Sequence, residues 1–254
     1  MALDSLNMSV FSLNGSNLLA VLKTFALPVD NDVSDGSGLA DRYEREVVTK
    51  QSQKVDFTVF QNNSNGVPCS NLDVSVWTLG GNYLGTLRGG SINLTTVTRE
   101  RSSIATGYKV PNANRTQYEV TTDLLVIDNA FTNAMITASG QAEFVVAVAI
   151  TFGVTTFSAN MTMRSTRITV DRGEMQMENV TFGPYGTPSG PNDSSLMGTI
   201  LLGSAAYTGI FDNGGSTYTG QVLITRLNTR FADSSLIESE GTLEVQGSFS
   251  VSGA

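Results

Sequence analysis

Apolar and polar residues alternate with a period of two along much of this 254-residue chain. Val55, Phe57 and Val59 alternate with polar residues in one such run, and Leu243 and Val245 do so near the carboxyl terminus. Successive side chains of an extended strand point to opposite faces of a sheet, so this period is typical of strands with one buried face. The pattern predicts an all-β fold, a sandwich or barrel of antiparallel strands.

Clusters of Gly and Asn separate the alternating runs and mark turns, and the step Gly80-Gly81-Asn82 predicts a tight hairpin. At most two short helices fit the pattern, over residues 130–135 and 196–201. The further runs that we interpret as strands share short length and close spacing. They span residues 18–27, 72–79, 91–98, 118–126, 144–152, 156–163, 175–182, 218–226 and 243–251.

Two polar segments, residues 30–46 and 185–195, are predicted to be long loops that reach a neighbouring subunit in an assembly. No polar linker divides the chain, so we expect a single domain over residues 1–254. Two alternatives stay open within it. The middle segment could be an extra surface insertion, and the similarity between residues 26–30 and 167–171 could record a degenerate duplication.

The residues available for chemistry argue against an enzyme. The chain has no His, which excludes His-based catalytic triads, His metal sites and the commonest general base. No phosphate-binding glycine loop precedes a helix, and we expect no cofactor. Cys69 follows Pro68 in a turn without a cationic setting that would favour the thiolate, so it is interpreted as an ordinary thiol.

Carboxylates gather in the first of the two predicted loops. Asp30, Asp32, Asp35 and Asp41 have a spacing close to that of a calcium-binding loop, which makes them the one metal-site candidate. The turn glycine is displaced to Gly36 and the last ligand is Asp instead of Glu. A solvated acidic loop is the competing interpretation, and we prefer it.

Charge and hydropathy limit the partners of the chain. The net charge of −8 argues against the basic surface that binds nucleic acid through its phosphates, and an acidic surface lets a duplex pass without binding it. The longest apolar run, residues 144–150, is too short to cross a bilayer, so we expect no membrane. The amino terminus has no basic and apolar leader that would direct secretion.

Both ends of the chain resemble bacteriophage tail tube (major tail) proteins. The similar residues are FSLNGSNLLAVLK at 11–23, FALPVDNDV at 25–33, the strand at 54–60 and the closing GTLEVQGSFSVSG at 241–253. The resemblance implies a structural virion protein that forms rings, most commonly of six subunits, which stack into a tube. It also implies that DNA passes through an acidic lumen without specific binding.

The resemblance further implies where contacts lie and where the protein is found. The polar segment after residue 29 would reach the next ring, and the protein would be made in the bacterial cytoplasm and reside in the virion beside other tail proteins. The inter-ring candidates are Asp30, Asp32, Asp35, Arg42, Arg45 and Glu46. A capsid decoration or head-fibre subunit is an alternative, and a secreted carbohydrate-binding or adhesive module is a third hypothesis.

Overall fold

A computed structural model defines the fold. It describes residues 8–13, 15–37, 45–62, 68–69, 74–79, 82–83, 87–101, 107–125, 132, 136, 145–170, 172, 176–191, 196–201, 206–232 and 235–253. The described chain is built almost entirely of strands joined in one sixteen-stranded sheet, and the strands pair antiparallel. The all-β prediction is therefore confirmed.

The strands share antiparallel pairing and differ mainly in length. They are β1 (Val10–Leu13), β2 (Ser16–Asn17), β3 (Leu22–Ala26), β4 (Val29–Asp35), β5 (Glu46–Phe60), β6 (Val74–Leu79), β7 (Asn82–Tyr83), β8 (Leu87–Glu100), β9 (Pro111–Leu125), β10 (Val145–Phe152), β11 (Thr155–Thr169), β12 (Met177–Pro184), β13 (Tyr207–Asp212), β14 (Thr217–Ala232), β15 (Glu238–Val245) and β16 (Ser250–Ser252). A 3₁₀ turn, η2 (Leu19–Val21), and a helix, α2 (Leu196–Leu201), complete the described elements.

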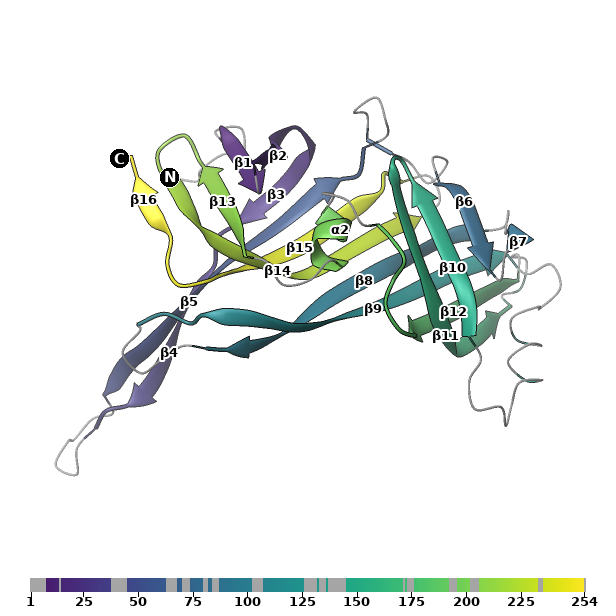
Figure 1. The fold of residues 1–254 in the computed structure, drawn as a ribbon, viewed down its shortest axis with the longest axis horizontal. Helices are drawn as coiled ribbons and strands as arrows, with labels where there is room; N and C mark the ends of the chain where they lie inside the picture. Colours follow the sequence, from purple (N-terminus) through teal and green to yellow (C-terminus); the bar gives the residue numbers. More distant parts are fainter. Residues whose placement is uncertain are drawn as a thin grey trace.

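Strand β14 is the centre of the sheet because it has two partners along each edge. Its first half pairs with β13 on one edge and β16 on the other, and its second half pairs with β8 and β15. From β8 the sheet continues through β9, β12, β11 and β10 to β6. The β1, β3 and β13 strands thus lie at one side of the molecule and β10, β11 and β12 at the other, with β14 and β15 between them (Figure 1).

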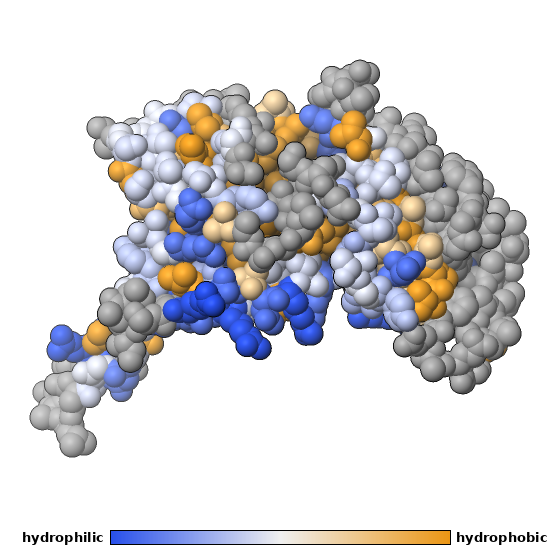
Figure 2. Space-filling model, viewed as in Figure 1, coloured by the Kyte–Doolittle hydropathy of each residue, from blue (hydrophilic) through white to orange (hydrophobic). Residues whose placement is uncertain are grey.

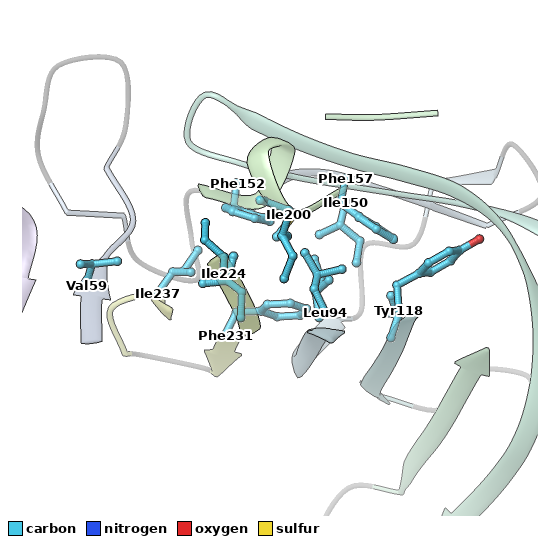
Figure 3. Packing of buried hydrophobic residues seen from close by; sticks show 14 of the residues in the cluster. Val59, Leu94, Tyr118, Ile150, Phe152, Phe157, Ile200, Ile224, Phe231 and Ile237 are labelled. Atoms are coloured by element: carbon cyan, nitrogen blue, oxygen red, sulfur yellow. The ribbon is translucent and has the colours of Figure 1, made fainter. Parts of the chain in front are cut away.

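The alternation seen in the sequence becomes a buried inner face. Val55, Phe57 and Val59 are buried on β5, and Leu243 and Val245 are buried on β15, as predicted. Helix α2 packs against β8 and β14 and contributes buried side chains to the same core. Figure 3 shows one of them, that of Ile200, among residues of the surrounding strands.

An aromatic cluster joins the amino-terminal strands to the rest of the sheet. The ring of Phe11 lies 5.4 Å from Phe57 and 5.3 Å from Phe211, measured between centroids. Phe25 and Phe249 contact the Phe211 ring at 5.7 Å each. Aromatic pairs at these separations add to the free energy of area burial, so β5, after leaving the exposed hairpin, ends in a firmly packed region of the body of the protein.

Most predicted strands are confirmed, with bounds shifted by a few residues. Helix α2 and the β6–β7 hairpin are also confirmed, with Leu79 opposite Asn82. The predicted closing strand over 243–251 is interrupted, because β15 ends at Val245 and β16 begins at Ser250. Strand β13 was not predicted. The expected helix over 130–135 lies outside the described residues apart from Thr132, which is helical.

The prediction of a loop over residues 30–46 is wrong at both ends. Strand β4 continues to Asp35, and β5 begins at Glu46. The physical reason is that both faces of this hairpin are exposed, so apolar alternation has no buried face to record. The second predicted loop is confirmed where it is described, since residues 185–191 contain only an isolated bridge at Gly190.

Candidate assembly interface

A two-stranded hairpin projects from the body of the protein, and we call it the arm. It consists of β4 and the paired residues 46–53 of β5, with Val29 opposite Gln53 at its base and Asp35 opposite Glu46 near its tip. Figure 1 shows the arm extending away from the rest of the sheet. Strand β4 has seven residues, so the paired part of the arm is about 23 Å long at 3.3 Å per residue.

The arm is exposed on its faces and along one edge. All seven residues of β4 are exposed, and in the described chain β4 pairs only with β5. Four valines of the arm remain largely in solvent: Val29 (48% exposed), Val33 (51%), Val47 (41%) and Val48 (57%). Figure 2 shows apolar and strongly hydrophilic residues side by side on the arm. An unpaired strand edge can pair with a strand of another chain, and exposed apolar side chains beside it can be buried in the same contact.

The tip of the arm is shaped by a bulge and a glycine. The register shifts between Asp32 and Val33, after which Val33 lies opposite Val48. The Gly36 amide donates to the Arg45 carbonyl at 2.7 Å, which extends the ladder beyond Asp35. A Cβ atom at Gly36 would lie 2.4 Å from Cγ2 of Val47, so the glycine allows this valine to lie across the hairpin.

Charged residues brace the middle of the arm against the end of the β8–β9 hairpin. The Lys109 ammonium donates to Asp32, with a nitrogen–oxygen separation of 2.7 Å in the ion pair, and this hydrogen bond raises the pKa of the lysine. Lys50 pairs with Glu100 in the same region. The backbone also takes part, because the Gln51 carbonyl accepts from the Lys109 amide at 3.0 Å. The arm is therefore held in direction as far as its middle, and its outer part, from Val33 to Asp35 on β4, projects beyond this contact.

The arm contains most of the candidate residues, but in a strand and not in a loop. Asp30 lies 4.0 Å from the Lys54 ammonium, and Asp32 pairs with Lys109. Asp35 accepts a hydrogen bond from the Ser37 amide at 2.8 Å. Arg45 and Glu46 are exposed where β5 begins. Two candidates, Asp41 and Arg42, lie outside the described residues.

The calcium-loop candidates do not converge in the described part of the chain. Asp30, Asp32 and Asp35 follow one another along an extended strand, which separates their carboxylates. Among the described residues, no group of three or more His, Cys, Asp or Glu side chains could hold a metal ion. Two of these carboxylates face lysines, and hydrogen bonds from Ser37 lower the pKa of the Asp35 carboxyl.

The valines of the arm are the functional candidates that sequence reasoning missed. A signal was present in the adjacent pair Val47 and Val48, because two neighbouring strand residues point to opposite faces and a one-sided core can bury only one of them. The polar context hid this signal, since the segment was interpreted as a loop. Exposed valines on both strands of a projecting hairpin make it a candidate contact surface.

Comparison with known protein families and curated proteins assigns this chain to no family. In the part of the chain that the structure describes, no helix is long and apolar enough to cross a membrane. The chain matches no protein-family model and no curated protein, so the function must be argued from the arm and the sheet themselves.

Proposed function

We propose that this protein is a structural virion subunit that assembles with copies of itself into stacked rings, forming the tail tube through which phage DNA passes. The observation that carries the proposal is the arm, an exposed hairpin with an open edge and four solvent-exposed valines. The resemblance of residues 11–33 and 241–253 to tail tube proteins supports it, and the all-β fold agrees with it.

The energetics of the arm favour a partner. A hairpin of two strands without a packed face is marginally stable in water at best. The four valines are each about half exposed, so covering them would contribute about 3–6 kcal/mol in total. Pairing of the open β4 edge with another chain would satisfy its backbone groups as well. The isolated chain thus leaves unrealised a stabilisation that an assembly supplies.

The length of the arm and the net charge of the chain agree with a role as a tube subunit. The outer part of the arm, about 10 Å from Val33 to Asp35, extends beyond the contact with the β8–β9 end and can lie on a neighbour. The net charge of −8 repels the phosphate backbone, which lets DNA pass without specific binding. In this proposal the partners are other copies in a ring, by resemblance sixfold, and other tail proteins. The protein works through surfaces, without catalysis, a cofactor or a membrane.

The test compares assembly of the wild type with that of an arm variant. Negative-stain electron microscopy and sedimentation velocity across protein concentrations should show stacked rings or hollow tubes for the wild type. The variant Val33→Thr/Val48→Thr keeps shape and β-propensity but removes about 1.5–3 kcal/mol of burial per arm contact. We expect its critical concentration for assembly to rise about tenfold to a hundredfold.

A matched control uses valines of similar exposure away from the arm. Val154 and Val170 are each 67% exposed, so Val154→Thr/Val170→Thr should assemble as the wild type does. A wild-type protein that stays monomeric at every concentration would overturn the proposed function. Discrete trimers without tubes would also overturn it and would favour a capsid decoration or fibre subunit.

A further inference from the structure

Two carboxylates lie opposite each other near the tip of the arm, with no ion-pair partner among the residues that the structure describes. Asp35 lies directly opposite Glu46 in the β4–β5 ladder, and both side chains are exposed. Neither forms an ion pair with a described residue, although Asp35 accepts a hydrogen bond from Ser37. Like charges directly opposite one another destabilise an antiparallel pair. The Asp35–Glu46 pair is therefore an anionic site that a cationic side chain of another molecule would stabilise.

Three arginines form a cluster of positive charge at the end of the β8–β9 hairpin, and we call this cluster the arginine patch. They are Arg99, Arg101 and Arg115, all exposed and without an ion-pair partner among the described residues. Thr96 on β8 is buried, so Val97 and Arg99 lie on the outer face of this strand. Arg115 lies opposite Val97 and thus shares that face.

The arginine patch belongs to a rigid, strongly hydrophilic part of the surface. Strand β8 pairs with β9 from Leu87 to Glu100, and the Arg101 amide extends this ladder by donating to the Val110 carbonyl at 2.9 Å. Figure 2 shows hydrophilic residues gathered over this end of β8 and β9. The backbone that carries Arg99 and Arg115 is therefore held in paired strands, which lowers the entropy lost when the patch binds.

The chemistry of the two sites is complementary. A guanidinium presents a planar fork of donors that matches a carboxylate in two parallel hydrogen bonds. The Cα atoms of Asp35 and Glu46 are about 5 Å apart because the two residues lie opposite each other in the ladder. Two neighbouring arginines can therefore bind both carboxylates at once. The Asp35–Glu46 pair supplies the negative charge that the arginine patch can bind, and the patch supplies the positive charge that the acidic pair can bind.

The arm of the same chain cannot satisfy its own arginine patch. The Lys109–Asp32 and Lys50–Glu100 pairs hold the middle of the arm against the β8–β9 end. From there the arm tip projects beyond that end and away from the body (Figure 1). The partner must therefore be a second molecule with an anionic hairpin, and a second copy of this chain has one.

We propose that the arginine patch of one copy receives the acidic arm tip of the next, through Arg99 and Arg115 to Asp35 and Glu46. This inference rests on the proposed function, because it names the surface by which the copies meet. It adds an electrostatic contact to the apolar one made by the valines. The contact selects a partner and its orientation, which apolar side chains alone do poorly.

The experiment is a charge exchange followed by sedimentation velocity and electron microscopy. The arm variant is Asp35→Arg/Glu46→Arg, and the patch variant is Arg99→Glu/Arg115→Glu. We expect each alone to raise the critical concentration for assembly at least tenfold, because like charges then meet at every contact. An equimolar mixture of the two should assemble as the wild type does, since each new arm then meets a complementary patch.

Controls separate this effect from misfolding and from net charge. The variant Arg167→Glu/Arg172→Glu changes the net charge as the patch variant does, at exposed arginines of another region, and should assemble normally. Rescue in the mixture excludes misfolding of either variant. Wild-type assembly should weaken between about 50 mM and about 500 mM NaCl, because salt screens exposed charges.

The outcomes distinguish this inference from the proposed function. If the wild type forms tubes and both variants form them equally well, the charge contact is overturned and the tube stands. If the mixture fails although circular dichroism shows both variants folded, the contact is also overturned. If the wild type forms only closed dimers that the charge exchange controls, the contact is supported and the tube is overturned. A wild type that never assembles overturns both.

Discussion

Replacing Tyr118 by Phe tests how a buried hydroxyl fastens the long segment after β12. The hydroxyl donates to the Gly186 carbonyl at 3.1 Å and accepts from the Tyr185 amide at 3.2 Å. The ring is 4% exposed and contacts Phe157 at a centroid distance of 6.0 Å. The change removes one oxygen atom and keeps this packing, so it tests the hydrogen bonds of the hydroxyl, which also lies 3.4 Å from the Asn160 carbonyl oxygen on β11.

The size of the stability loss depends on whether the backbone groups that bonded to the hydroxyl can bind water instead. Tyr185 and Gly186 are exposed, so their backbone groups can bind water once the hydroxyl is gone. The loss is then close to the net value of the bonds, about 1–2 kcal/mol of the free energy of unfolding, and not a full desolvation penalty. For a chain of this size that corresponds to a fall of about 2–8 °C in Tm.

The loss is measured by urea unfolding at neutral pH, with Tyr218→Phe as the control. Tyr218 contacts the Phe249 ring, and its hydroxyl has no hydrogen-bond partner among the described residues. We therefore expect less than about 0.5 kcal/mol from the control. Hydrogen exchange at the Tyr185 amide should also be faster in the Tyr118→Phe variant and unchanged in the control. An equal effect of the two changes would refute the role assigned to the Tyr118 hydroxyl.

The same hydroxyl predicts a dependence on alkaline pH. Burial raises the pKa of Tyr118 above its ordinary value of 10.0, so the unfolded chain releases this proton first as pH rises. The contribution to stability is complete below pH 10.0 and is lost as pH rises through the folded-state pKa. The wild type should lose more stability above pH 10.0 than Tyr118→Phe does, and parallel curves would contradict the assignment.

Two further predictions concern the sheet and the ion pair that braces the middle of the arm. Gly90→Ala should lower the free energy of unfolding by at least about 2 kcal/mol in urea titrations, because φ is +155° and the new Cβ would lie 2.3 Å from the Thr121 carbonyl oxygen. A stable alanine variant would contradict this close approach of β8 and β9. Lys109→Met should speed hydrogen exchange along β4 by releasing Asp32, while global stability falls by less than about 1 kcal/mol because the ion pair is partly exposed. Lys23→Met removes a surface ion pair elsewhere and should leave exchange along β4 unchanged; equal exchange in both variants would show that the brace does not order the arm.

The one-sided strands of the core were within reach of the sequence. On β5, Val55, Phe57 and Val59 alternate with polar residues because one face packs and the other meets water, and this local difference is written in the order of residues. Turn chemistry likewise indicated the hairpin between β6 and β7. Strand β13 is not predicted because Gly209 weakens its alternation, and its Phe211 packs against aromatic rings of distant segments.

The arm shows what local pattern could not supply. A hairpin exposed on both faces has no buried face to impose a period, so residues 30–35 looked like a loop although backbone pairing makes them a strand. The candidates Asp30, Asp32, Asp35, Arg45 and Glu46 were named as a group, but their geometry came only with the register. The extended strand separates the carboxylates of the calcium-loop candidates, and the register places Asp35 opposite Glu46.

What the residues determine by themselves is the class of fold, since burial of one strand face depends on neighbours in sequence and follows a period of two. What only the tertiary structure decides is which strands pair and which side chains of distant segments meet. Lys109 and Asp32 are 77 residues apart in the chain, and Arg99 and Arg115 reach one face through the pairing of two strands. Such contacts depend on long-range pairing, whose register is selected by the whole core and not by any one segment.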